Sequence, residues 1–185
     1  MKFPEPLDDS YCTSTRIRIA RNLKNYPLGT FVTREQRKNI ESVAIEAFDS
    51  LKGSDLEGTY YPLSQLSEKD RNQLIADHFL FKEGDRFLAA CGLNRDWPES
   101  RGIFHNKSKT FLTWVNEEDQ FRIISMQSGG DIREVFNRLK RGAESISNIA
   151  EFAINPHLGA ITTCPTNCGT GLRASIHVKL PLLSK

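Results

Sequence analysis

The segment Ser14-Thr-Arg-Ile-Arg-Ile-Ala-Arg21 alternates charged and apolar residues with a period of two. This period is typical of a β-strand, in which successive side chains point to opposite faces of a sheet. The isoleucines would then face a core, while Arg16 and Arg18 would stand together on the opposite face. We therefore predict a strand over residues 14–20 that carries two guanidinium groups on its polar face.

The same alternation places single arginines in two further segments. Arg122 ends Asn116-Glu-Glu-Asp-Gln-Phe-Arg122, and Arg173 lies in Leu172-Arg-Ala-Ser-Ile-His177. A guanidinium group is a planar, permanently charged fork that fits phosphate oxygens. No Gly-x-x-x-x-Gly-Lys-[Ser/Thr] pattern occurs, so a P-loop cannot supply the phosphate contacts. The residues thus predict a polyphosphate ligand held by arginine side chains.

Helix and strand signals fill the rest of the chain. Thr33 and Gln36 form a capping box before an apolar series at helical spacing, Ser67 caps a second helix, and Asp131 with Glu134 begins a third. Alternating or apolar runs predict the remaining strands: Thr59–Tyr61, Arg86–Cys91, Ile103–His105, Thr110–Asn116 paired with Phe121–Met126 as a hairpin, and Leu172–Leu180. We therefore expect the α+β class, with a mostly antiparallel sheet and helices on one face.

Composition limits the organisation and the partners. The 185 residues suit one domain, with residues 1–13 as a polar N-terminal arm. A net charge of only +2 predicts no global attraction to nucleic acid. No apolar run is long enough to span a membrane, and the start lacks the apolar stretch of a secretory signal. We expect a cytoplasmic protein that binds neither nucleic acid nor membrane, with four free thiols.

Five motifs resemble the catalytic domain of the phosphagen (ATP:guanidino) kinases, most closely the arginine kinases. They are Ser14-Thr-Arg-Ile-Arg18, Asp77-His-Phe-Leu-Phe-Lys-Glu-Gly-Asp-Arg86, Asn116-Glu-Glu-Asp119, Cys164-Pro-Thr-Asn167 and Arg173-Ala-Ser-Ile-His177. The resemblance implies a glutamine-synthetase-like sheet with flanking helices, and a partial catalytic domain over residues 14–185. In this family a small helical domain precedes the region and more catalytic domain follows it. The fold would then be truncated on its C-terminal side, with an open sheet edge that favours self-association.

The resemblance also implies a site for ATP or ADP with Mg²⁺. Arginines would clamp the phosphates, and histidines near the backbone of Ser175 would contact the nucleoside. The implied nucleotide-binding set is Ser14, Thr15, Arg16, Ile17, Arg18, His78, Arg122, Arg173, Ala174, Ser175, Ile176 and His177. Mg²⁺ would be held largely by the nucleotide and water, with no protein residue assigned as a metal ligand.

Two further residues resemble the groups that the family uses on the guanidino substrate. Glu118 matches the carboxylate that pairs with the guanidinium and acts as its base, with Glu117 and Asp119 as supporting carboxylates. Cys164 matches the reactive thiol that lies against the same substrate. From the residues alone, the acidic triplet also fits a solvated charge cluster on a hairpin turn, and Cys164 a small buried residue.

The resemblance implies reversible transfer of the ATP γ-phosphate to a guanidino group, with arginine as the expected acceptor. Transfer to such a group needs a carboxylate nearby, because a guanidinium with a pKa above about 12 is a poor nucleophile until it loses a proton. Two other functions remain open at this point. One is a bacterial type of protein-arginine kinase, and the other is a truncated nucleotide-binding module without turnover.

Overall fold

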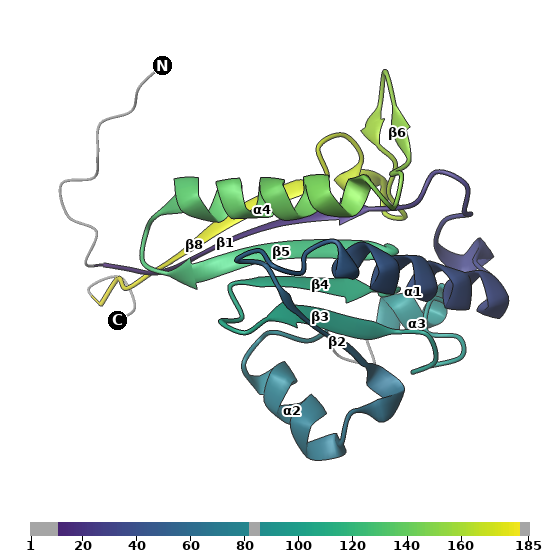
Figure 1. Ribbon diagram of the computed structural model, residues 1–185, viewed down its shortest axis with the longest axis horizontal. Helices are drawn as coiled ribbons and strands as arrows, with labels where there is room; N and C mark the ends of the chain where they lie inside the picture. The colour runs from purple at the N-terminus through teal and green to yellow at the C-terminus, as the bar shows by residue number, and fades with distance from the viewer. Residues whose placement is uncertain (1–10, 82–85, 182–185) are drawn as a thin grey trace.

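The computed structural model describes residues 11–81 and 86–181 (Figure 1). Its strands are β1 (Cys12–Arg21), β2 (Gly58–Pro62), β3 (Gly102–Asn106), β4 (Phe111–Val115), β5 (Phe121–Ser128), β6 (Ile154–Asn155), β7 (Gly159–Ala160) and β8 (Leu172–Val178). Its α-helices are α1 (Arg34–Asp49), α2 (Glu68–Ala76), α3 (Arg86–Ala90) and α4 (Ile132–Ser147). Three single 3-10 turns occupy Gly29–Phe31, Leu63–Gln65 and Pro165–Asn167.

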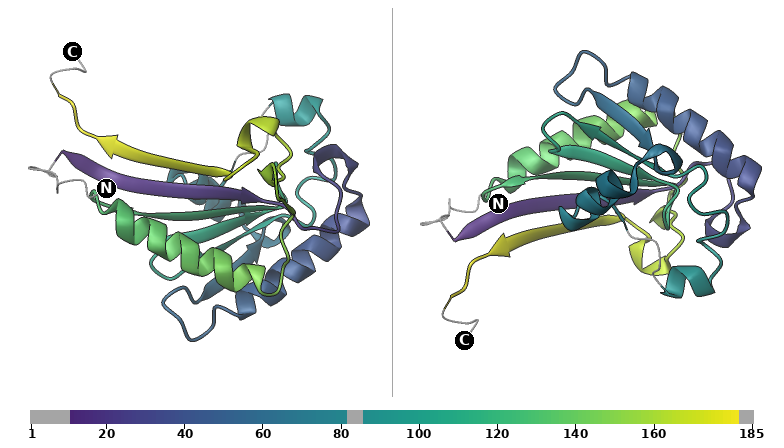
Figure 2. Two further views of the ribbon diagram at one scale, coloured as in Figure 1. Left: turned by 90° about the horizontal axis from the view of Figure 1, so that it is seen from above. Right: turned by 90° about the horizontal axis from the view of Figure 1, so that it is seen from below.

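Six strands form one antiparallel sheet in the order β2-β3-β4-β5-β1-β8. The expected antiparallel α+β fold is therefore confirmed. The first predicted strand is longer than expected and pairs on both sides, with β5 and with β8. Figure 2 shows β8 beside β1 at the outer margin of the sheet. The strands that carry the three groups of arginines are therefore immediate neighbours.

The hairpin of β4 and β5 divides its apolar residues between two cores. Phe111 and Val115 face one core together with residues of α1 and α4. Leu112 and Trp114 face a second core on the other side of the sheet, which includes Leu74 of α2. The alternation predicted for this hairpin is confirmed. The expectation of helices on one face is wrong in part, because α2 lies on the face opposite α1 and α4.

The helices begin at the predicted caps. The side chain of Thr33 accepts a hydrogen bond from the amide of Gln36 at 3.2 Å, and the Gln36 side chain accepts one from the Thr33 amide at 2.9 Å. Ser67 accepts from the amide of Asp70, and Asp131 from that of Glu134. Each cap satisfies an amide that the helix leaves without a partner, which explains why these short patterns locate helix starts well.

The prediction of a strand over Arg86–Cys91 is wrong. Arg86–Ala90 forms the helix α3 instead. Two consecutive alanines favour a helix, and the side chain of Phe87 is 68% exposed. The neighbouring part of the motif, residues 82–85, lies outside the described residues, as do residues 1–10 of the expected N-terminal arm.

The last strand differs from its prediction in burial. β8 ends at Val178 rather than Leu180, and the apolar side chains of both its ends remain exposed, with Leu172 at 40% and Val178 at 41%. The reason is its place at the margin of the sheet, because α4 packs chiefly on β1 and β5. Among the described residues this edge is open, as expected from the resemblance.

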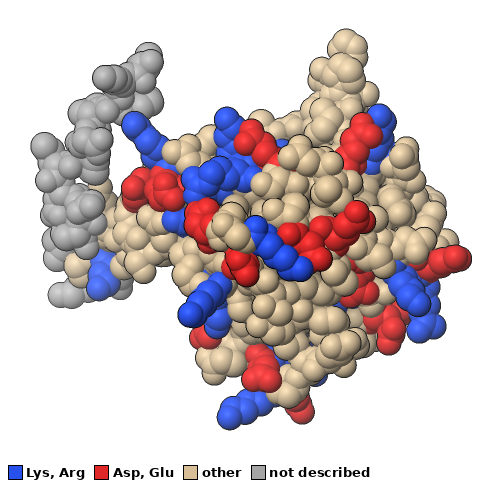
Figure 3. All heavy atoms as spheres, viewed as in Figure 1, with Lys and Arg blue, Asp and Glu red and all other residues tan. Residues whose placement is uncertain are grey.

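On the face of the molecule shown in Figure 3, basic and acidic side chains are interspersed, as the near-balanced composition predicts. All four cysteines are free thiols. Within residues 11–81 and 86–181, no helix combines the length and the apolar character needed to cross a bilayer.

Candidate active site

Strand register gathers the arginines on one face of the sheet. Arg18 of β1 lies directly opposite Arg173 of β8, and Arg122 of β5 lies opposite Ala20 of β1. Arg18, Arg122 and Arg173 line one narrow hollow together with Asn167 and Gly171. We call this surface the arginine face and include Arg16, which lies one strand period before Arg18.

Trp114 supports two of these guanidinium groups. The guanidinium carbons of Arg16 and Arg122 lie 5.8 Å and 5.5 Å from the centroid of its ring. The indole itself is fixed, because its Nε1 donates a hydrogen bond to the carbonyl of Phe79 at 2.6 Å. An aromatic ring at this distance attracts a cation through its quadrupole. Trp114 therefore attracts two arginines whose like charges repel each other.

The arginine face is electrostatically unfavourable in the absence of an anion. Burial lowers the pKa of Arg16, and the charges of Arg122 and Arg173 lower it further. The pKa of Arg18 is lowered by burial and then by Arg122, Arg16 and Arg173. The Nε of Arg16 is buried and has no hydrogen-bond partner among the described residues. Crowded, partly desolvated cations of this kind are suited to bind an anion with several oxygens.

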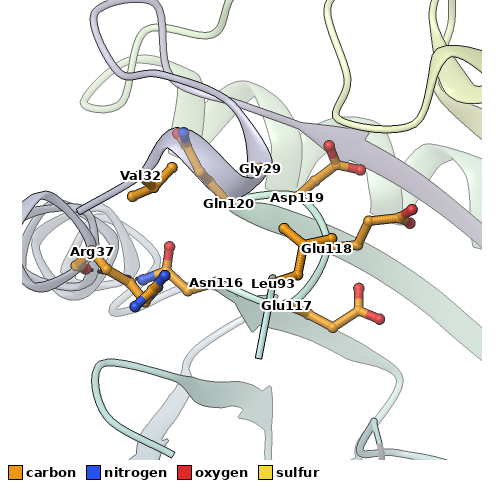
Figure 4. Close-up of a pocket in the computed structure, with 9 residues that line it drawn as sticks. All are labelled: Gly29, Val32, Arg37, Leu93, Asn116, Glu117, Glu118, Asp119 and Gln120. Carbon is orange, nitrogen blue, oxygen red and sulfur yellow. Dashed lines mark hydrogen bonds between the residues drawn. The ribbon is translucent and has the colours of Figure 1, made fainter. Parts of the chain in front are cut away.

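The acidic turn between β4 and β5 places negatively charged side chains next to the arginine face. Nη2 of Arg122 donates a hydrogen bond to Oε2 of Glu118 at 2.9 Å. The same nitrogen lies 3.0 Å from Oε2 of Glu117, as an ion pair without hydrogen-bond geometry. Figure 4 shows both carboxylates pointing the same way, away from Arg37. Arg122 is thus shared between the arginine face and this turn.

Asn116 fixes the start of the acidic turn. Its backbone is left-handed, with φ of 57°, a conformation that asparagine tolerates better than most residues. Its Nδ2 donates to the carbonyls of Arg37 at 3.0 Å and Ser100 at 2.7 Å. These bonds tie the turn to α1 and to the loop before β3. Figure 4 shows Asn116 beside Arg37 of α1. Nothing in the sequence beyond its place before the glutamates indicates this role.

Burial shifts the pKa of the Glu117 carboxyl group. The side chain is 11% exposed, and this desolvation raises the pKa of its carboxyl, although Arg122 opposes the shift. The charges of Glu118 and Asp119 raise it further. Glu117 therefore holds a proton more firmly in the folded chain than it would in water.

Asp119 connects the acidic turn to the loop that carries Cys164. Its Oδ1 accepts hydrogen bonds from the amide of Thr163 at 2.7 Å and from Nδ2 of Asn22 at 2.8 Å. Asp119 is only 2% exposed, so it braces the turn from the inside. Cys164 is half-buried, and its Sγ lies 2.9 Å from Oγ1 of Thr166. The structure thus brings the two segments of Glu118 and Cys164 together.

The expected nucleoside-binding residues lie at two places beside the arginine face. Ser14, Ser175 and His177 share this face, and Oγ of Ser14 lies 2.9 Å from Nδ1 of His177. His78 is exposed and has a left-handed backbone conformation just after α2. It directly precedes Phe79, whose carbonyl accepts the hydrogen bond from Trp114.

Four other members of the implied nucleotide set point away from the arginine face. Thr15 and Ile17 are buried on the opposite face, where Oγ1 of Thr15 donates to the carbonyl of Gly129. Ile176 and Ala174 are their cross-strand neighbours and share that opposite face. Alternation along β1 and β8 therefore prevents these four side chains from contacting a ligand on the arginine face.

The chain is similar to known proteins over most of its length. Residues 39–185 match the family model described as ATP:guanido phosphotransferase, C-terminal catalytic domain. A protein named probable arginine kinase of Caenorhabditis elegans is 52% identical over 177 residues, covering 96% of this chain and 49% of that protein. The testis isozyme of creatine kinase from Oncorhynchus mykiss is 47% identical over 191 residues, covering 100% of this chain and 50% of that protein.

A solved structure shares the fold. The duplicated taurocyamine kinase of Schistosoma mansoni, with bound components of a transition-state analogue, superposes with a TM-score of 0.91 at 47% identity, over 96% of this chain and 25% of that one. The chain therefore belongs to the ATP:guanido phosphotransferases, the phosphagen kinases, and carries sequence of their catalytic domain. It spans about half the length of the two curated relatives.

Replacing Glu117 by glutamine should stabilise the fold at neutral pH. Because the folded state raises the pKa of this carboxyl, ionised Glu117 costs stability above the folded pKa, and the cost disappears well below the ordinary value of about 4.3. We expect the midpoint of thermal unfolding to rise at pH 8, and in a chain of this length each kcal/mol gained corresponds to about 2–4 °C. The gain should vanish near pH 3.5, where both forms of the protein carry a neutral side chain.

Glu46→Gln is the matched control, since Glu46 lies exposed on α1. It should leave the pH dependence of unfolding unchanged. If Glu117→Gln gave the same difference from wild type at both pH values, the effect of burial on Glu117 would be refuted.

Proposed function

We propose that this site transfers the γ-phosphate of ATP reversibly to a guanidino group, with arginine as the acceptor. One observation carries the proposal: the guanidinium of Arg122 belongs to the arginine face and also bonds Glu118. An anion-binding surface and a cation-binding carboxylate thus meet at one residue. Such a junction is what in-line transfer from a polyphosphate to a basic nucleophile requires.

The arginine face is assigned to the phosphates of ATP. Arg16, Arg18, Arg122 and Arg173 would place several charge-assisted donors on the triphosphate, where charge spreads over the oxygens during transfer. The bound phosphates would in turn relieve the repulsion between these arginines. Ser175 and His177 are assigned to the nucleoside because they lie on the same face. His78 is assigned with them because it precedes Phe79, whose carbonyl bonds Trp114.

Glu118 is assigned to the acceptor. Its carboxylate accepts a hydrogen bond from a guanidinium, that of Arg122. An acceptor guanidinium has the same charge and the same planar fork, so it can take this carboxylate when Arg122 turns toward phosphate. Glu118 would then hold the acceptor and receive its proton. Cys164 would lie on the other side of the acceptor, where a thiolate favours the cation.

Magnesium is assigned to the nucleotide and its waters. Within the described ranges, no three His, Cys, Asp or Glu side chains gather so as to hold a metal ion. Mg²⁺ commonly keeps several waters and binds through substrate phosphates. The ion would neutralise phosphate charge during transfer, while the residues of this chain bind and orient the two substrates.

The choice of arginine rests on resemblance. A relative named probable arginine kinase covers nearly the whole chain, but a creatine kinase and a taurocyamine kinase match almost as well. Thr166 in Cys164-Pro-Thr-Asn167 resembles the arginine kinases, where creatine kinases usually have serine. The acceptor is therefore best decided by direct competition among arginine, creatine and taurocyamine.

Arg173→Ala should weaken MgATP binding by about tenfold or more while leaving the fold intact. Arg173 is exposed on a margin strand, and a hydrogen bond to a charged group is typically worth about 1.5–3 kcal/mol. Isothermal titration calorimetry measures the change. Arg133→Ala is the control, since Arg133 is exposed on α4 across the sheet. Equal affinities in the two variants would refute the phosphate assignment.

Glu118→Gln should abolish transfer to arginine while MgATP affinity falls by no more than about threefold, because the amide cannot accept the proton of the acceptor. Phosphorus NMR of the chain with MgATP and each acceptor follows the transfer directly. Wild type should form a phosphorus–nitrogen product from arginine before creatine or taurocyamine.

Other outcomes decide between the functions. Transfer to an arginine-rich protein but not to free arginine would establish protein-arginine kinase activity instead. Binding of MgATP by wild type without any transfer would leave a nucleotide-binding module. Loss of MgATP binding in Glu118→Gln, with acceptor kinetics preserved, would show that Glu118 serves the nucleotide.

A further inference from the structure

Asn22 lies where three parts of the site meet. It directly follows β1, the strand of Arg16 and Arg18, and its side chain is 1% exposed. None of the five motifs that carry the resemblance to the phosphagen kinases includes it. A buried carboxamide must have its polar atoms hydrogen-bonded, so its partners reveal what it holds together.

The carboxamide bonds two segments that are remote in sequence. Its Nδ2 donates to Oδ1 of Asp119 at 2.8 Å and to the carbonyl of Ile161 at 3.1 Å. Its Oδ1 accepts from the amide of Gln120 at 2.8 Å. Both amide protons and the oxygen are therefore used. One bond set reaches the acidic turn and the other reaches the loop that leads to Cys164.

The carboxylate of Asp119 connects Asn22 to the loop that carries Cys164. Oδ1 of Asp119 accepts from Asn22 and also from the amide of Thr163, the residue before Cys164. The backbone carbonyl of Asn22 accepts from the amide of Ala153 at 2.7 Å, which secures the chain ahead of this loop. Asn22 is thus bonded to the turn, to the loop and to the segment that precedes it.

We propose that Asn22 is a positioning residue, which sets Glu118 and Cys164 at a fixed place relative to the arginine strand β1. The inference rests on the function proposed above for these residues. Asn22 is buried and bonds neither glutamate of the turn, so it acts through Asp119, Gln120 and Ile161. Its donor group is essential, because both of its acceptors are oxygens and one is a carboxylate.

Asn22→Asp removes the Nδ2 donor alone and so tests its role. Aspartate has nearly the same shape and can still accept from the amide of Gln120, but it places a second carboxylate against Asp119. Asn22→Ala removes donor and acceptor together. Asn22→Ser, which keeps a small polar group, covers the case in which the other two variants do not fold. All three should loosen the turn and the loop relative to β1.

Asn106 provides the matched control. It is 3% exposed, its Oδ1 accepts from the amides of Thr110 and Phe111, and its Nδ2 donates to Oγ1 of Thr110. It therefore fixes the turn between β3 and β4 in the same chemical way, without any contact to the acidic turn or to the Cys164 loop. Asn106→Asp, Asn106→Ala and Asn106→Ser should reproduce the general cost of losing a buried carboxamide.

The first measurement is amide hydrogen exchange by mass spectrometry under conditions where every variant is folded. In the Asn22 variants, exchange in peptides covering residues 116–121 and 161–168 should be roughly tenfold faster than in wild type, because local opening no longer breaks these bonds. In the Asn106 variants it should stay within about twofold of wild type. Equal protection in both sets would overturn the proposal.

The second measurement separates positioning from general stability. In the Asn22 variants the dissociation constant of arginine, in the presence of MgADP, should rise about tenfold while that of MgATP stays within about twofold. Equal weakening of both ligands, or weakening of neither, would overturn the positioning role. If wild type itself failed to bind arginine or transfer phosphate, the proposed function would fail, and the exchange result would still decide whether Asn22 holds the two segments.

Discussion

The site depends on the pairing of β1 with both β5 and β8. This register sets Arg18 directly opposite Arg173 and places Arg122 on the next strand, all on one face. Like charges directly opposite each other on a sheet are destabilising. The chain offsets part of this cost through Trp114, whose ring lies beside Arg16 and Arg122, and through Glu118, whose carboxylate accepts a hydrogen bond from Arg122. Binding of a polyphosphate would offset the remaining repulsion between the arginines.

Buried amides hold the acidic turn on both sides. Asn116 anchors its first residue to α1 and to the loop before β3, and Asn22 anchors its end through Asp119 and Gln120. Glu117 and Glu118 are left to face Arg122. Placing charged groups accurately in this way is what transfer by alignment demands, because a fixed site spends little free energy on reorganisation during the reaction.

Local patterns predicted the elements of the fold well. The caps at Thr33 and Asp131 and the alternation around Trp114 depend on neighbours within a few residues, and the structure confirms them. Burial of β8 could not be predicted in this way, because it depends on which helix covers which strand. The same limit explains Arg86–Ala90, where the environment of a short apolar run decides between strand and helix.

The candidate site was predictable only where side chains alternate along a strand or belong to a motif. Arg16, Arg18, Arg122 and Arg173 meet as the alternation predicted. The assignment of Thr15 and Ile17 conflicts with that same alternation, and both are buried on the far face. Asn22 was not predictable, since its partners lie 97 to 139 residues away in the sequence.

If the arginine face anchors a nucleotide by its phosphates, as proposed, inorganic tripolyphosphate should compete with MgATP. Calorimetric competition of tripolyphosphate and of adenosine against MgATP, at two salt concentrations, measures this. Tripolyphosphate should displace MgATP, its affinity should fall steeply as the salt concentration rises, and adenosine should compete weakly. Strong competition by adenosine with no effect of tripolyphosphate would refute the phosphate assignment of the arginine face.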